Sequence, residues 1–289
     1  MAGSRSLLTL GNTITAALRL YLQQPRRYLG QSLVAHLWLL VPIYGWLKFA
    51  ALSGRIARMF WLQIGERTES KAECDRIINS NFIRFWLIHL TVYLLFIVTT
   101  AIVYIGISIV LGLILAVILV VTNVQILDSL LSSGLDSGLL SVGDTLTVIL
   151  GFGVIVAVAL CDTLIYARLF LGELPLAVTP QAPLGQALRQ SWQLTSRYTF
   201  KIAAIIWMAW FLTVPLALVL GFVLTFAIAF GLALVTEQEA PGAFVVLMIL
   251  LTTAVQSLVT LPFWQAVKAV TYYDLRDRTE GIGLTLQER

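Results

Sequence analysis

The residues of this chain that could do chemistry are isolated polar side chains set within long apolar stretches. The sharpest of them is Asp162, which lies inside the apolar stretch 154–170. A carboxylate is costly in the hydrocarbon part of a bilayer, so such a residue indicates a functional site by default. The structural alternative is that Asp162 lies near a membrane edge and pairs with Arg168 or with a helix terminus. The sequence favours this alternative.

Three more polar side chains, His36, His89 and Gln256, also lie in hydrophobic segments. Neither histidine has a second histidine, a cysteine or a carboxylate at ligand spacing on its own helix, which argues against a metal site. We therefore expect the histidines to pack or to hydrogen-bond between helices. The sequence contains no glycine-rich phosphate loop, nucleophile elbow or paired-carboxylate motif. These observations predict a protein without enzymatic activity, metal ion or cofactor.

The surroundings of these polar residues indicate a membrane protein. Of the 289 residues, 59% are hydrophobic and 12% are charged, whereas about a quarter of the residues of a soluble domain are charged. The stretches 85–127 and 202–236 contain no Asp, Glu, Lys or Arg. A helix needs about 20 apolar residues to cross ~30 Å of hydrocarbon. The sequence thus predicts an all-α, polytopic bundle of transmembrane helices that fills residues 1–289 as a single domain.

The polar segments are also expected to be helical. Residues 7–24 and 184–195 have apolar side chains at helical spacing and predict amphipathic helices that lie in the membrane interface. Ser70 and Glu73 have capping-box spacing, which predicts a helix that runs from there through Phe82 into the membrane.

Five hydrophobic segments remain, namely 28–47, 85–121, 146–170, 202–235 and 242–267. The second exceeds one bilayer thickness, so it forms either one long helix or a hairpin that turns near Gly106 or Gly112. In the fourth, Pro215 and Gly221 are candidates for a kink or a turn.

The distribution of Lys and Arg predicts the topology. Basic residues gather before residue 28, in 55–84, in 168–201 and in the tail, which is residues 268–289; the segments 122–144 and 236–242 contain none. The positive-inside rule puts the basic segments and both termini in the cytoplasm. Because segment 28–47 has basic residues on both sides, it is either re-entrant, which charge counting favours, or it crosses and a long run is a hairpin. The sequence predicts four crossings, and up to six if segment 28–47 crosses and a long run is a hairpin.

A weak internal repeat connects two parts of the chain. The segment beginning at Ile14 aligns with the one beginning at Leu184, with identities at an Ala-Leu-Arg triplet, at Gln23 and Gln193, and at an Arg-Tyr pair. Two explanations stay open: a duplication, or convergence of two interfacial helices. A duplication would imply a pseudo-symmetric bundle, as in many transporters.

The start of the tail carries a charged helical pattern. Asp274 and Arg278, and likewise Arg276 and Glu280, have i, i+4 spacing, and Gly281 suits the position that ends a helix. We expect a structural role first. A docking surface for a partner is the second interpretation, formed by Tyr273, Asp274, Arg276, Arg278 and Glu280.

Two segments resemble a known family. The stretch from Thr271 to Leu284 is similar to the C-terminal signature of bacterial membrane proteins related to the glycerophosphoryl diester phosphodiesterase membrane domain, although Gly283 stands where that family often has Asp. Ala187-Leu188-Arg189 and the following Ser191-Trp192 resemble a helix that precedes the family's later spans. The resemblance implies a roughly six-helix protein of a bacterial cytoplasmic membrane or a membrane derived from it. It does not imply hydrolysis, because the family's phosphodiesterase activity resides in a separate barrel domain.

Two functions follow from these features. The first is a non-enzymatic accessory, scaffold or lipid-associated membrane protein. Its partners would be membrane lipids, and another membrane protein or complex is a candidate partner. The net charge of +4 is explained by residues at membrane edges, so we expect no nucleic acid partner. The second function is a transporter or permease for a small molecule or lipid, suggested by the repeat and the buried polar residues.

Overall fold

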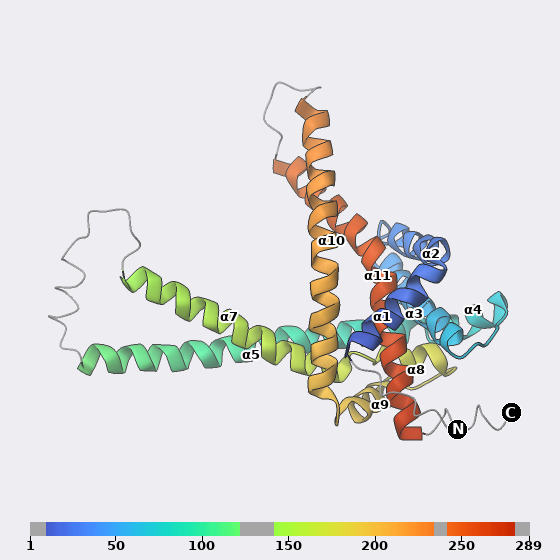
Figure 1. The fold of residues 1–289 in the computed structure, drawn as a ribbon, viewed down its shortest axis with the longest axis horizontal. Coiled ribbons are helices and arrows are strands. Elements are labelled where there is room, and N and C mark those ends of the chain that lie inside the picture. The colour runs from blue at the N-terminus through green and yellow to red at the C-terminus, as the bar shows by residue number, and fades with distance from the viewer. Residues whose placement is uncertain (1–9, 122–141, 234–241, 281–289) are drawn as a thin grey trace. The chain divides into compact units, whose positions relative to one another are not determined.

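The computed structural model describes residues 10–121, 142–233 and 242–280, and the regular structure in these ranges is α-helical. Figure 1 shows the helices, which are α1 (Leu10–Gln23), α2 (Pro25–Trp38), α3 (Tyr44–Ile64), α4 (Lys71–Ser80), α5 (Phe82–Val121), α7 (Val142–Leu169), α8 (Glu173–Val178), α9 (Leu184–Thr195), α10 (Thr199–Ala233) and α11 (Gly242–Glu280). Four segments have the length and composition of membrane spans: Phe82–Val110, Gly151–Val178, Thr199–Ala227 and Ile249–Thr279. The predicted all-α fold is confirmed.

The chain divides into two units. The first contains residues 1–91 and 167–289, and the second contains residues 92–166. In the first unit, α11 lies against α1, α2, α3 and α10 (Figure 1). The second unit consists of parts of α5 and α7 in the described ranges.

The hydrophobic segment 28–47 does not form one helix. α2 ends at Trp38 and α3 begins at Tyr44, and Ile43 between them has a φ of 63°, a conformation that β-branched residues rarely adopt. The 14 residues of α2 extend over ~21 Å, which is less than ~30 Å of hydrocarbon. The break therefore favours the re-entrant interpretation over a simple crossing.

The long apolar runs are continuous helices. α5 has 40 residues and passes through Gly106 and Gly112, so the hairpin alternative for this run is wrong. α10 has 35 residues and contains Pro215. Gly221 makes no turn; a Cβ atom there would lie 2.7 Å from Nε2 of Gln256, so this glycine permits a close approach of α10 and α11.

One predicted helix is interrupted at Asn81. Ser70 caps α4 as expected, since its Oγ accepts a hydrogen bond from the Glu73 amide at 3.2 Å. The helix does not run on through Phe82, however. The buried Asn81 side chain donates to the carbonyl oxygens of Leu176 and Thr179, at 2.9 and 3.1 Å, and these contacts hold the junction between α4 and α5 against α8.

The two helices of the suspected repeat have matching burial. Ala17 on α1 and the aligned Ala187 on α9 are both fully buried, and Tyr21 and Ser191 follow them as buried residues. Arg19 and the aligned Arg189 are exposed. Both helices contact α11. A duplication stays a prediction, because similar packing on one helix would produce the same pattern.

Candidate functional site

A buried ion pair joins α8 to α11 within the first unit. The side chain of Glu173, in the first turn of α8, is 3% exposed, and its Oε1 lies 2.5 Å from Nζ of Lys268. The Lys268 ammonium also lies over the Phe170 ring, 5.7 Å from its centroid. Removing one member of such a pair leaves an uncompensated buried charge, which costs about 3–5 kcal/mol. Glu173 and Lys268 therefore depend on each other.

His89 of α5 is the third member of this site. Its Nδ1 lies 2.7 Å from the Phe85 carbonyl oxygen, and its Nε2 lies 3.3 Å from Oε2 of Glu173. Because a carbonyl only accepts, Nδ1 carries a hydrogen. The ring therefore bridges the backbone of α5 and the Glu173 carboxylate. The His89 side chain is 40% exposed, whereas that of Glu173 is 3% exposed.

Other charged and polar side chains fix the far end of α8. Arg58 makes two hydrogen bonds to the Glu69 carboxylate, at 2.8 and 2.6 Å, and a third nitrogen donates to the carbonyl oxygen of Ala177. The last carbonyls of a helix have no partner within it. Arg58 and Asn81 provide such partners for α8. This short helix is therefore held at both ends by buried polar contacts.

Asp162 occupies a different environment, in the second unit. Its Oδ1 and Oδ2 lie 3.0 and 2.7 Å from the hydroxyl oxygens of Thr99 and Thr100 on α5. The expected pairing with Arg168 is not found. The Arg168 guanidinium instead lies over the Trp192 ring, at 5.2 Å, because α9 offers an aromatic face close to the end of α7.

His36 and Gln256 connect α11 to its neighbours. Nε2 of His36 lies 2.7 Å from the Ser257 hydroxyl, and Nδ1 lies 2.8 Å from the Ser32 carbonyl oxygen. The Gln256 amide donates to the Ala217 carbonyl of α10 at 2.6 Å. Both residues thus hydrogen-bond between helices, as expected for the histidine, and neither faces the Glu173 site.

The polar residues of the tail contact their own chain. Arg278 donates to Asp274 at 2.9 Å, which confirms this i, i+4 pair, and its guanidinium lies over the Tyr198 ring at 5.7 Å. Tyr273 and Arg276 lie against the Trp61 ring, at 5.4 and 5.8 Å. The helix ends at Glu280, whose side chain lies outside the described part, as does Gly281. The docking role of these five residues stays a prediction.

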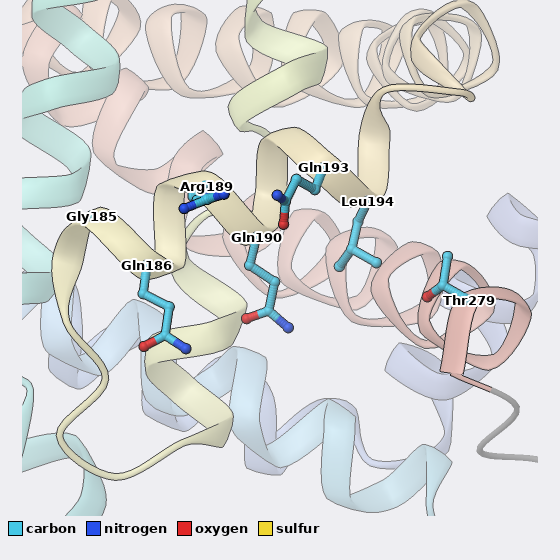
Figure 2. A pocket seen from close by; sticks show the side chains of 7 residues that line it. All are labelled: Gly185, Gln186, Arg189, Gln190, Gln193, Leu194 and Thr279. Atoms are coloured by element: carbon cyan, nitrogen blue, oxygen red, sulfur yellow. The ribbon is translucent and has the colours of Figure 1, made fainter.

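A pocket of about 920 Å³ lies along α9 and the end of α11. It is lined by Gly185, Gln186, Arg189, Gln190, Gln193, Leu194 and Thr279. Figure 2 shows the lining side chains of α9, with Thr279 on the neighbouring α11. Spacings of three and four residues put the three glutamines and Arg189 on one side of α9. Gln190 also donates to the buried Tyr272 hydroxyl at 3.3 Å, which connects the pocket to the tail.

Comparisons with protein-family models, with characterised proteins and with solved structures returned no match to this chain. Function is therefore argued from the sites themselves. In the part of the chain that the structure describes, no group of three or more His, Cys, Asp or Glu side chains could hold a metal ion.

Sequence reasoning singled out His89 but missed Glu173, Lys268 and Arg58. Glu173 lies just after the hydrophobic segment 146–170, outside every segment that the sequence singled out, and Lys268 is the first residue of the charged tail. A signal was present, because a lone acid and a lone base each border an apolar segment. Their pairing depends on α8 lying beside α11, which spacing along the chain does not reveal.

Proposed function

We propose that this chain is a non-enzymatic membrane protein with a lipid-associated, accessory role, and that the α9 pocket binds the anionic headgroup of a lipid. Four helices with the composition of membrane spans support the membrane location. The pocket supports the binding of an anionic headgroup, because its lining combines the Arg189 guanidinium with the amide donors of three glutamines.

The chemistry of the pocket suits a phosphate group. Arg189 is exposed, and Gln186 and Gln193 are its neighbours on the same side of α9. Guanidinium and amide N–H groups are donors that match phosphate oxygens. Trp192 of the same helix is 49% exposed, and amphipathic helices with exposed aromatic residues lie at the level of lipid headgroups. The described lining contains no carboxylate, histidine or cysteine, which supports binding rather than reaction.

Native mass spectrometry of the full chain in a neutral detergent tests this proposal, with phosphatidylglycerol as the probe. Arg189→Ala should weaken binding by about one to two orders of magnitude, because a hydrogen bond to a charged group contributes about 1.5–3 kcal/mol. Arg19→Ala is the matched control, since Arg19 is exposed at the aligned position of α1 and does not line the pocket. An equal loss in both variants, or no loss in either, would contradict the proposal.

The expected orientation belongs to the same proposal. The count of Lys and Arg supports a cytoplasmic location of both termini, and the resemblance of the tail supports a bacterial cytoplasmic membrane or one derived from it. Another membrane protein stays a candidate partner through the tail.

A second candidate function is a permease for a small molecule or lipid. It is favoured by the Glu173, His89 and Lys268 site, because ionisable residues within membrane spans are typical of transport pathways. Proteoliposomes with a trapped pH-sensitive dye would test a proton-coupled form of this function. Proton entry should then be lost in the double variant Glu173→Gln/Lys268→Met, which leaves no unpaired buried charge. Absence of proton flux through the unmodified chain would count against this candidate.

A further inference from the structure

The turn between α2 and α3, which we call the α2–α3 tip and define as residues 39–46, is an exposed apolar surface. Leu40 is 80% exposed and Ile43 is 72% exposed. The other large apolar side chains exposed on the tip are those of Leu39, Val41, Tyr44 and Trp46. The surrounding stretch 28–47 contains no Asp, Glu, Lys or Arg. An exposed apolar patch of this kind marks a site that contacts another apolar surface.

The backbone of the tip is suited to hydrocarbon, where each amide must find its hydrogen-bond partner within the protein. The amides of residues 39–41 donate to carbonyl oxygens in the last turn of α2, at 3.0, 3.3 and 3.0 Å. The amides of Tyr44 and Gly45 donate to the carbonyl oxygens of Pro42 and Val41, at 2.7 and 3.0 Å. Proline itself has no amide hydrogen. The chain thus reverses direction with these amides paired inside the turn, as lipid requires.

Contacts with α11 place α2 beside a membrane span of the same unit. The Ser32 hydroxyl of α2 donates to the Leu258 carbonyl oxygen at 2.7 Å. Leu258 lies within Ile249–Thr279, which has the length and composition of a span. Leu33 and Leu37, one helical turn apart on α2, are exposed. Because α2 lies beside a span, acyl chains are the apolar surface that its exposed leucines and the α2–α3 tip would contact.

Cations lie on both sides of this apolar segment. Arg26 and Arg27 are exposed at the start of α2. Lys48 follows the tip on α3, and its ammonium lies over the rings of Tyr44 and Phe82, 5.7 and 4.9 Å from their centroids. Among the described residues of the first unit, no carboxylate forms an ion pair with Lys48. Its ammonium is therefore available to a phosphate group of an anionic lipid.

Distances along the chain match one leaflet of a bilayer. Lys48 lies five residues after Ile43, which is about 8 Å along a helix. One leaflet contributes ~15 Å of hydrocarbon, half of the ~30 Å layer. The tip can therefore be embedded while the lysine side chain extends back toward the headgroups.

We infer that the α2–α3 tip inserts into the acyl chains of a single leaflet without crossing the bilayer, and that Lys48 binds the phosphate of an anionic lipid at the edge of that leaflet. The basic residues before and after the apolar segment then lie on the same side of the membrane. This lipid contact uses residues separate from the α9 pocket, and it does not depend on lipid binding there.

Depth-dependent fluorescence quenching of the full chain in liposomes tests the insertion. An environment-sensitive label is attached through Leu40→Cys, in a background in which both native cysteines are replaced by alanine. Lys71→Cys is the matched control, because Lys71 is exposed on the polar helix α4. Nitroxides on acyl chains should quench the label at position 40 and spare the one at position 71. Iodide, present on both sides of the membrane, should do the reverse. Quenching at position 40 by iodide would overturn the insertion.

The same label tests the role of Lys48. Nitroxide-labelled phosphatidylglycerol should quench it more than nitroxide-labelled phosphatidylcholine, because one basic residue at the membrane surface enriches anionic lipids about fivefold. Lys48→Gln should remove most of this preference, and Lys48→Arg should keep it. Arg189→Ala, which alters the α9 pocket, should leave the preference unchanged. A preference that is absent from the unmodified chain, or that survives Lys48→Gln, would overturn the assignment of Lys48.

Discussion

At the scale of single residues, close contacts decide what each position tolerates. Phe85, in the first turn of α5, is fully buried in a cluster that includes Ala51, Ile78 and Leu176. Gly54 of α3 faces the Phe85 ring, and a Cβ atom at this position would lie 2.2 Å from Cε1 of the ring. The ring occupies the space that any larger residue would need.

Gly54→Ala should therefore destabilise the protein. The ring has to shift within a packed core, and such overpacking costs about 1–3 kcal/mol. Gly30→Ala in α2 is the matched control, because its Cβ would meet no atom within 4 Å and alanine favours the helix by up to about 1 kcal/mol. Thermal unfolding in detergent measures both variants. Equal stability of the two would show that the Phe85 ring moves freely.

Tyr28 provides a test with pH at the same scale. Burial raises the pKa of the Tyr28 hydroxyl to about 12, against a smaller opposite effect of Arg27. The Tyr28 hydroxyl donates to Oε1 of Gln63, and the ring stacks on Phe60.

The folded state holds this phenol proton more strongly than the unfolded state does. The resulting stability is fully present below the ordinary tyrosine pKa of about 10 and is lost as the pH rises toward about 12. Ultraviolet titration should show a late-ionising tyrosine signal that Tyr28→Phe reduces; burial raises the pKa of Tyr21 as well, so part of the signal remains. A Tyr28 that ionises together with exposed tyrosines would contradict this prediction.

At the scale of the elements, α2 compensates for a proline in α11. Pro262 has no amide hydrogen, so the Leu258 carbonyl loses its helical partner. The Ser32 hydroxyl donates to this carbonyl at 2.7 Å, and the Tyr21 hydroxyl donates to the next one, of Val259, at 3.2 Å. The contact between α2 and α11 is therefore specific to the position of the proline.

A double-mutant cycle tests this relation. Ser32→Ala should cost about 1–3 kcal/mol in the unmodified protein, because it leaves the half-buried Leu258 carbonyl without a partner. The same change should cost less in a Pro262→Ala background, where the amide of residue 262 restores the helical hydrogen bond. Unfolding free energies of the four proteins measure the difference. Equal costs in both backgrounds would show that Ser32 and Pro262 act independently.

At the scale of the whole molecule, an even number of crossings puts both termini on the same side. Four helices have the composition of spans, and segment 28–47 is broken at residues 39–43. Reporter fusions to each terminus, with one reporter active in the cytoplasm and one active outside, test the topology in a bacterial host. Both termini should report the cytoplasm. Termini on opposite sides would show that segment 28–47 crosses.

The sequence by itself determined the fold class and most helix positions. The reason is that charge-free runs and amphipathic periodicity are local properties of the sequence. The expected helix 184–195, for example, coincides with α9. Local signals did not find the stop at Asn81, because contacts of its side chain with residues far along the chain contribute to it.

The candidate sites were decided by tertiary structure. The sequence identified Asp162 and His89 as polar residues in apolar surroundings, but their partners lie 62 to 84 positions away along the chain, at Thr99, Thr100 and Glu173. The Glu173–Lys268 pair joins residues 95 positions apart. Hydrophobic patterning predicts which helices form. The partner of a buried charge depends instead on which helices are in contact and on the position along each helix axis where they meet.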